Sequence, residues 1–206
     1  MEKMEKMDKI GSRIKKSLNN KDKSREKGLP LTRKVIRFSS EIIKMAHRGQ
    51  LQESRTLLEE AGKILREAQK SLEKYPDIYY GGFLQSAEKE YAEATITLAL
   101  IKKQSLPSPE VLKIGGTSYL RGMGEAIGEM RRYILDSIRK DKLSDCERLL
   151  GLMDEMYYFL FSFDYPEPLV RGLRRTVDSA RGLIERTRAD VTNAVCQKRL
   201  EEKLSK

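Results

Sequence analysis

The chain has 206 residues, 39% of them hydrophobic, which is enough apolar material for the core of one domain or two small ones. It carries 41 Lys and Arg against 31 Asp and Glu, and the net charge of +10 favours a polyanionic partner, nucleic acid before a membrane surface. Two widely separated cysteines, Cys146 and Cys196, and a single histidine argue against a disulfide scaffold or a zinc site.

The N-terminus alternates charges and has no apolar leader, and no run of about 18 apolar residues follows it. We therefore expect a soluble, cytoplasmic protein with no membrane partner. The first residues, 1–20, are rich in lysine and predict an arm or an extra helix ahead of a single helical domain at 21–206.

Beyond the arm, apolar side chains recur in steps of three and four along most of the chain, which is the spacing of amphipathic helices. A break is expected at Gly28–Pro30, and a helix then continues to Arg48. Five further apolar stripes predict helices at 51–72, 84–101, 120–134, 146–160 and 173–194. Because no segment alternates with a period of two, the fold class is all-α, a bundle of long antiparallel helices.

The segment Tyr119–Arg132 places three glycines in a predicted helix. Gly122, Gly124 and Gly128 would each cost roughly 1 kcal/mol relative to alanine at such a position. This cost predicts either a close approach of a neighbouring helix or a site beside the acids of the same segment.

Two predicted helices each carry a pair of glutamates that converge on one point. Glu90 and Glu93 stand at i and i+3, and Glu125 and Glu129 stand at i and i+4. Bundles hold divalent cations with such pairs, and an all-oxygen set without a Glu-x-x-His unit favours Mg²⁺ or Mn²⁺ over a di-iron centre. A cation there could activate water and neutralise a phosphodiester. The alternative is four ordinary exposed glutamates, since E-x-x-E is common on helices.

A basic stripe predicts contact with phosphates in the segment before Arg48. It consists of Arg33, Arg37, Lys44 and Arg48 on one helix face, with Lys34 nearby and His47 at its end. A solvated face is the alternative. For the pairs Tyr79–Tyr80 and Tyr157–Tyr158, core packing is favoured over stacking on unpaired bases.

Three stretches, Arg25–Arg48, KEYAEA at Lys89–Ala94 and YLRGMGEAIGEMRRYILDSI at Tyr119–Ile138, together resemble the translin and translin-associated factor X family. The resemblance covers residues 25–195. It implies a seven-helix bundle that assembles into a hollow, usually octameric, shell and binds single-stranded RNA or single-stranded DNA.

The acids distinguish the two branches of that family. Glu90 and Glu93 match the E-x-x-E segment of the catalytic, factor X-like branch, Glu125 stands where that branch commonly has Asp, and Glu129 matches the acid four residues later. The chain resembles an archaeal-type, self-sufficient member. The resemblance implies a Mg²⁺-dependent endoribonuclease that cleaves single-stranded or unpaired RNA inside a homo-octamer. The alternative is a non-catalytic, translin-type oligomer that binds single-stranded RNA or DNA.

Overall fold

A computed structural model describes residues 2–205, and the side-chain surroundings of residues 4–205. Met1 and Lys206, at the outer ends of the predicted arm and domain, lie outside the described residues. Within this range the chain forms six long helices, three single-turn α-helices and one 3-10 turn, and it has no strand, so the all-α prediction is confirmed. The elements are α1 (Glu2–His47), α2 (Leu51–Leu72), α3 (Pro76–Tyr79), α4 (Phe83–Ile101), α5 (Pro109–Leu112), α6 (Gly116–Ile138), η1 (Leu143–Asp145), α7 (Cys146–Phe161), α8 (Glu167–Val170) and α9 (Leu173–Leu204).

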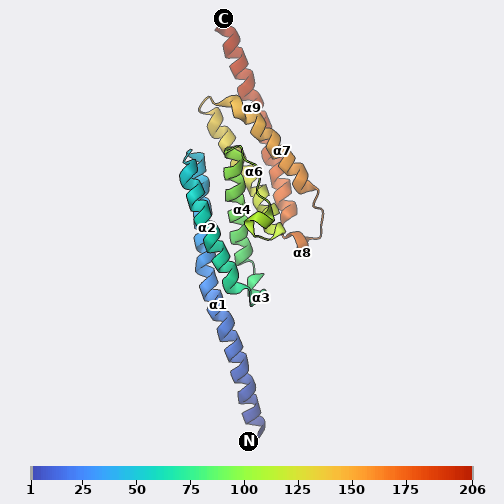
Figure 1. Ribbon diagram of the computed structural model, residues 1–206. Helices are drawn as coiled ribbons and strands as arrows, with labels where there is room; N and C mark the ends of the chain where they lie inside the picture. The colour runs from blue at the N-terminus through green and yellow to red at the C-terminus, as the bar shows by residue number, and fades with distance from the viewer. Residues whose placement is uncertain (1, 206) are drawn as a thin grey trace.

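The long helices lie side by side in an elongated bundle, with the two chain ends at its opposite poles (Figure 1). Helix α1 packs on α2 and α4, α4 packs on α6, and α6 packs on α7 and α9. Helices α4 and α6 are therefore the centre of the bundle. Burial follows the predicted stripes, because Leu65 and Leu72 of α2 and Ile127, Met130 and Ile134 of α6 are almost fully inaccessible to solvent.

Helix α1 is continuous, so the predicted break at Gly28–Pro30 is wrong. Pro30 lies inside the helix, where its missing N–H removes one backbone hydrogen bond. The helix persists because it is packed there: a Cβ on Gly28 would lie 2.9 Å from a methyl carbon of Leu72. Further toward the N-terminus, Lys21 forms a 2.6 Å ion pair with Asp77 of α3. Tertiary contacts on the N-terminal side of the proline thus hold this part of the helix against α2 and α3.

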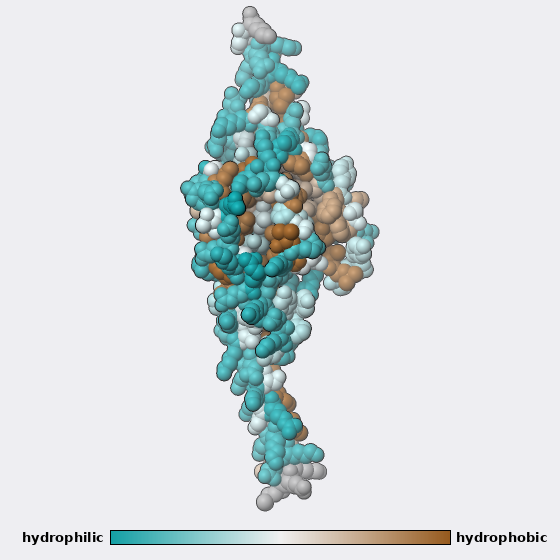
Figure 2. Space-filling view, in the orientation of Figure 1, coloured by the Kyte–Doolittle hydropathy of each residue, from teal (hydrophilic) through white to brown (hydrophobic). Residues whose placement is uncertain are grey.

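The part of α1 that precedes Lys21 extends beyond the bundle. Figure 1 shows it as a projecting helix, and Figure 2 shows a mostly hydrophilic surface on it. Met4, Met7, Ile14 and Leu18 are exposed along it. The predicted arm is therefore helical over its described residues. Over the described chain, no helix combines the length and the apolar composition that crossing a membrane requires.

Candidate metal and nucleic-acid site

The glycines of α6 allow two neighbouring helices to come close. A Cβ on Gly122 would lie 2.6 Å from the carbonyl oxygen of Lys89 and 2.9 Å from the amide nitrogen of Glu93, both on α4. A Cβ on Gly124 would overlap the Thr176 side chain of α9. The predicted close approach is therefore confirmed at these two glycines. Gly128 differs, because its nearest neighbour would be a methyl carbon of Leu183 at 3.8 Å, an ordinary contact.

The contact of α4 with α6 brings the four predicted glutamates into one cluster, which we call the acidic cluster: Glu90, Glu93, Glu125 and Glu129. Burial of Glu93 raises its pKa to about 8, and the negative charges of Glu90, Glu125 and Glu129 add to this rise. A carboxyl group with this pKa holds its proton at pH 7. The cluster lies where α4 and α6 meet, with Glu93 half-buried and Glu125 exposed to solvent.

A lysine that sequence reasoning missed lies within the acidic cluster. The Lys89 ammonium is 3.1 Å from Oε1 of Glu90 and 3.5 Å from Oε1 of Glu125, so it bridges α4 and α6. Burial by itself would lower the pKa of Lys89, but Glu90, followed by Glu125 and Glu93, raises it above its usual value. Lys89 therefore stays charged and offsets part of the repulsion among the acids.

His47 also belongs to the acidic cluster, although the sequence grouped it with the basic stripe. Its Nε2 lies 2.6 Å from Oε2 of Glu129, and its side chain is 5% exposed. This hydrogen bond lowers the pKa of Glu129, against the opposing effect of partial burial, and Arg132 at 3.9 Å acts in the same direction. Nδ1 of His47 is buried and has no hydrogen-bond partner among the described residues. Glu129 is thereby held as a carboxylate.

By donor type, the acidic cluster suits a hard cation such as Mg²⁺ or Mn²⁺, since every candidate ligand is a carboxylate oxygen. The positions of these oxygens, however, are not those of a preformed coordination shell. Among the residues that the structure describes, no group of three or more His, Cys, Asp or Glu side chains stands ready to hold a metal ion. A cation would need Glu93 to lose its proton and the oxygens of the two helices to draw together around it.

The basic stripe lies on the outer part of α1. Arg33, Arg37, Lys44 and Arg48 are exposed, and a hollow of about 430 Å³ is lined by the last three of them. Lys34 is partly buried, 3.4 Å from Glu60 of α2. The structure thus leaves four of the six predicted basic residues free to face solvent together.

Core packing was expected for both tyrosine pairs, and in each pair this prediction is wrong for the second tyrosine. Tyr80 is 61% exposed and Tyr158 is 69% exposed, whereas Tyr79 and Tyr157 are partly buried beneath them. Each exposed ring meets its neighbour edge-on, with ring centroids 5.0 Å apart in the first pair and 5.4 Å in the second. Each pair lies close to a helix end, where the last turn leaves one ring outside the bundle.

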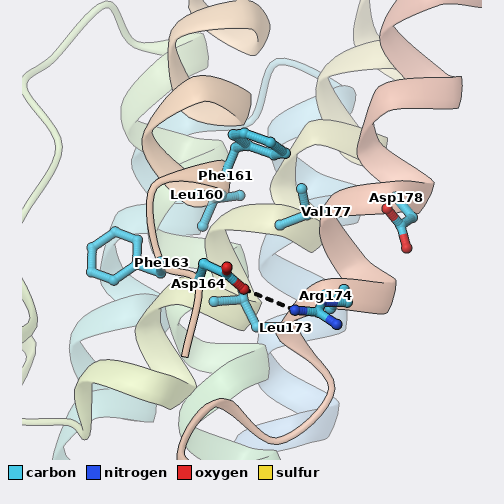
Figure 3. A pocket seen from close by; sticks show the side chains of 8 residues that line it. All are labelled: Leu160, Phe161, Phe163, Asp164, Leu173, Arg174, Val177 and Asp178. Carbon is cyan, nitrogen blue, oxygen red and sulfur yellow. Dashed lines mark hydrogen bonds and ion pairs between the residues drawn. The ribbon is translucent and has the colours of Figure 1, made fainter. Parts of the chain in front are cut away.

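A separate hollow of about 320 Å³ lies between the end of α7 and the start of α9 (Figure 3). Leu160, Phe161 and Val177 line it, and Asp164 is joined to Arg174 by a 2.8 Å ion pair. Besides Asp164 its lining has one further acid, Asp178, against the four acids of the acidic cluster, which remains the candidate metal site.

Comparison with known proteins places these features in context. No protein-family model matches the chain. An uncharacterized protein of Methanocaldococcus jannaschii is 32% identical over 192 residues, which cover 92% of this chain and 84% of that protein.

Solved structures share the fold. AfC3PO in complex with duplex RNA superposes with a TM-score of 0.85 at 31% identity, covering 90% of this chain and 96% of that one. The crystal structure of AfC3PO gives a TM-score of 0.84 at 31% identity, covering 90% and 97%. Apo-NeC3PO, at 20% identity and a TM-score of 0.81, covers 89% of this chain and 96% of its own, and shows the shared fold alone.

Proposed function

The chain belongs to the translin and translin-associated factor X family, and from that premise we propose that it is a Mg²⁺-dependent endoribonuclease acting on single-stranded or unpaired RNA. The observation that carries the proposal is the acidic cluster, in which two packed helices bring four carboxylates within electrostatic range of one another. A structural role does not require this arrangement, because gathering like charges costs stability, and Lys89 and the proton on Glu93 offset only part of that cost.

In this proposal Glu90, Glu93 and Glu125 hold the cation, and Glu129 completes or orients the set. The cation supplies charge neutralisation at the phosphodiester and a more acidic water molecule. Glu93 has to release its proton before it can hold the cation, and its pKa of about 8 makes this loss accessible near neutral pH. His47 holds Glu129 in one orientation through its 2.6 Å hydrogen bond. In the metal-free protein, Lys89 reduces the charge repulsion between Glu90 and Glu125.

RNA is the proposed polyanion for two reasons. The net charge of +10 and the exposed arginines and lysines of the basic stripe favour phosphate contacts. The solved complex of AfC3PO with duplex RNA, at 31% identity, supports the same class of ligand for this chain. Contacts of this kind give affinity with steep salt dependence and little sequence preference.

Self-association into a shell, with the octamer as the expected size, completes the proposal. Large apolar side chains exposed near the ends of α7 and α8, such as Phe161, Tyr165 and Leu169, would bury area against neighbouring subunits. Figure 2 shows brown patches on the middle of the molecule that are compatible with such contacts.

One observation favours a second candidate, a non-catalytic oligomer that binds single-stranded RNA or DNA. The Lys89 ammonium already lies between Glu90 and Glu125, where a bridging cation would bind. If the lysine does not yield to a metal ion, the acidic cluster is a self-neutralised structural feature.

Incubation of the purified protein with labelled single-stranded RNA, in Mg²⁺ and in EDTA, separates the two candidates. Metal-dependent cutting supports the endoribonuclease, and a mobility shift without cutting supports the binder. Glu93→Ala should abolish cutting while RNA affinity stays within about twofold of wild type. Glu185→Ala, which removes an exposed glutamate from α9, is the matched control and should cut normally. Undiminished cutting by the Glu93 variant would remove the basis of the proposal.

A further inference from the structure

A second polar hollow lies where α3, α6 and α8 meet, apart from the acidic cluster. It has a volume of about 330 Å³ and opens beside the first turn of α6. Its lining includes Tyr79, Tyr80, Glu88, Ser118, Arg121 and Arg171. Both exposed and buried polar groups therefore face one space at the end of the α4–α6 pair. The functions proposed above leave this hollow without a role.

Two arginines give the hollow a positive charge. Arg121 stands in the second turn of α6, and Arg171 follows α8, where its Nη1 reaches the carbonyl oxygen of Tyr80 at 3.5 Å. Within the described side chains, neither guanidinium forms an ion pair with a carboxylate. In a chain where many arginines are paired with acids, two unpaired ones on the same hollow are suited to an anion.

The start of α6 adds to this field. Gly115 precedes the helix and provides no side chain to cap its first N–H groups, and the helix runs for 23 residues behind them. Such a terminus favours a bound anion through its free N–H groups and its dipole. The arginines and the free amides thus act on the same space.

The acid in the lining, Glu88, offsets part of this charge, but two guanidinium groups face its single carboxyl group. Glu88 is 3% exposed, and its two oxygens accept hydrogen bonds from Nε2 of Gln69 at 2.9 Å and from Oγ of Ser118 at 3.0 Å. These bonds tie α2, α4 and α6 together beneath the hollow. Glu88 therefore makes the floor rigid, while the two arginines remain available to a ligand.

An aromatic ring completes the set. Tyr80 exposes 61% of its surface, and Tyr79 braces it edge-on from beneath. Unpaired bases stack on exposed aromatic rings, and every base offers a face for this contact. A nucleotide in a single strand can use both features, since its phosphate needs a positively charged site and its base needs an exposed aromatic face.

The hollow and the acidic cluster lie along the same helix, α6. Arg121 precedes Glu125 by four residues and therefore shares its face of α6. From Gly116 to Glu125 the helix rises about 13 Å, which a short single strand can span. A strand anchored in the hollow would continue along α6 toward the carboxylates.

We propose that this hollow is a nucleotide subsite: one base of the RNA stacks on Tyr80, while its phosphate binds Arg121, Arg171 and the first N–H groups of α6. The subsite rests on the proposed RNA substrate and deepens it, because it anchors the strand beside the acidic cluster. It selects unpaired RNA, since a base within a duplex cannot present its face to Tyr80.

The test measures binding without cleavage. Affinity for a fluorescein-labelled single-stranded RNA hexamer is followed by anisotropy in EDTA. Tyr80→Ala should weaken binding about fivefold or more, the expected loss for one stacked base. The double variant Arg121→Ala/Arg171→Ala should weaken it about tenfold or more and flatten the salt dependence. Thermal unfolding of each variant establishes that the fold is retained.

Matched controls change the same residue types elsewhere. Tyr158→Ala removes an equally exposed tyrosine, and Arg181→Ala/Arg186→Ala removes two exposed arginines of α9. Both should bind the hexamer as wild type does. Wild-type affinity in the Tyr80 and double-arginine variants would overturn the subsite, and so would losses of equal size in the controls.

Two further arms separate the sources of failure. Adenosine monophosphate is titrated alone. Tight binding of adenosine monophosphate, together with hexamer affinity that is unchanged in every variant of the hollow, would mean that the site binds free nucleotides. That outcome would overturn its proposed role in RNA binding. If the wild type fails to cut RNA in Mg²⁺ but the variants still lose hexamer affinity, the subsite stands and only the endoribonuclease assignment falls.

Discussion

His47 near the end of α1 and Glu129 in the middle of α6 are joined by a hydrogen bond of 2.6 Å between Nε2 and Oε2. The bond links a helix on one side of the bundle to the central helix that carries two of the four acids. It also places the chain's single histidine behind a proposed metal ligand, not on the exposed face of the basic stripe. Buried hydrogen bonds of this type commonly orient a ligand carboxylate.

His47 is not itself a proposed metal ligand, but its replacement should weaken metal binding through Glu129. We expect His47→Ala to lower Mn²⁺ affinity about tenfold, because Glu129 loses the partner that fixes its orientation and keeps its pKa low. Titration of Mn²⁺ followed by electron paramagnetic resonance measures the affinity directly. His47→Gln, which keeps an N–H donor, should recover part of the loss. Equal affinity in all three proteins would show that the histidine does not act on the site.

The raised pKa of Glu93 predicts how stability depends on pH in the absence of divalent cations. This carboxyl group ionises near 4.5 in the unfolded chain and near 8 in the folded one, so the folded state holds the proton more tightly between these values. Its contribution is fully present below about pH 4.5 and is lost as pH rises through 8. At about 1.4 kcal/mol per tenfold difference in acidity, the loss is on the order of a few kcal/mol.

Glu93→Gln removes this titration and should give a flatter profile than wild type between pH 5 and pH 8. Urea unfolding at pH 5, 6.5 and 8 measures the difference, and the exposed-site variant Glu185→Gln should follow the wild-type curve. Parallel curves for wild type and Glu93→Gln would mean that Glu93 is ionised in the folded protein at neutral pH.

Gly122 and Gly128 offer a matched pair for testing the contact between α4 and α6. Gly122→Ala should destabilise the protein by about 1–3 kcal/mol, because the added methyl group meets backbone atoms of α4 that cannot move aside. Gly128→Ala adds the same methyl group where there is room, and should be neutral or stabilising by up to about 1 kcal/mol. Chemical unfolding gives both values. Two similar values would contradict the tight approach at Gly122.

If the basic stripe contacts phosphates, removing one of its arginines should change how RNA affinity depends on salt concentration. Arg37→Ala should weaken binding of every RNA sequence tested and reduce the slope of log affinity against log salt by about 0.7, the value for one lost contact with a single-strand phosphate. Arg181→Ala removes an exposed arginine from α9, where it pairs with Glu185, and serves as the control. A slope unchanged by Arg37→Ala would exclude this residue from the RNA contacts.

The parts of the fold that depend on local spacing were predictable. Leu65, Leu72 and Ile134 lie on stripes of period 3.6, and a stripe of this kind must be buried whichever helix covers it. The close approach at Gly122 was also predictable, because bare backbone in a helix needs a reason. Convergence of the four acids followed from the same two helices and from the resemblance to a known family.

The remaining features depend on which helix meets which. Lys89 bridges to Glu125 on another helix, and His47 reaches Glu129 across 82 positions, so no local pattern contains either pair. The continuity of α1 reflects packing of Leu72 on Gly28, which overrides the weak local preference of a Gly-Leu-Pro sequence. Tyr80 is exposed because a short helix ends beside it, and apolar periodicity does not report such ends.

The straight course of α1 limits how the lengths of related chains can vary. Lys21 is tied to Asp77 and His47 to Glu129, so both ends of this stretch have fixed positions around the helix axis. One inserted residue between them would rotate one end by about 100° relative to the other and break one of the two bonds. Before Lys21 the helix extends free of the bundle, so residues can be gained or lost there at little cost. Relatives should therefore differ in length ahead of Lys21 and keep a constant spacing from Lys21 to His47.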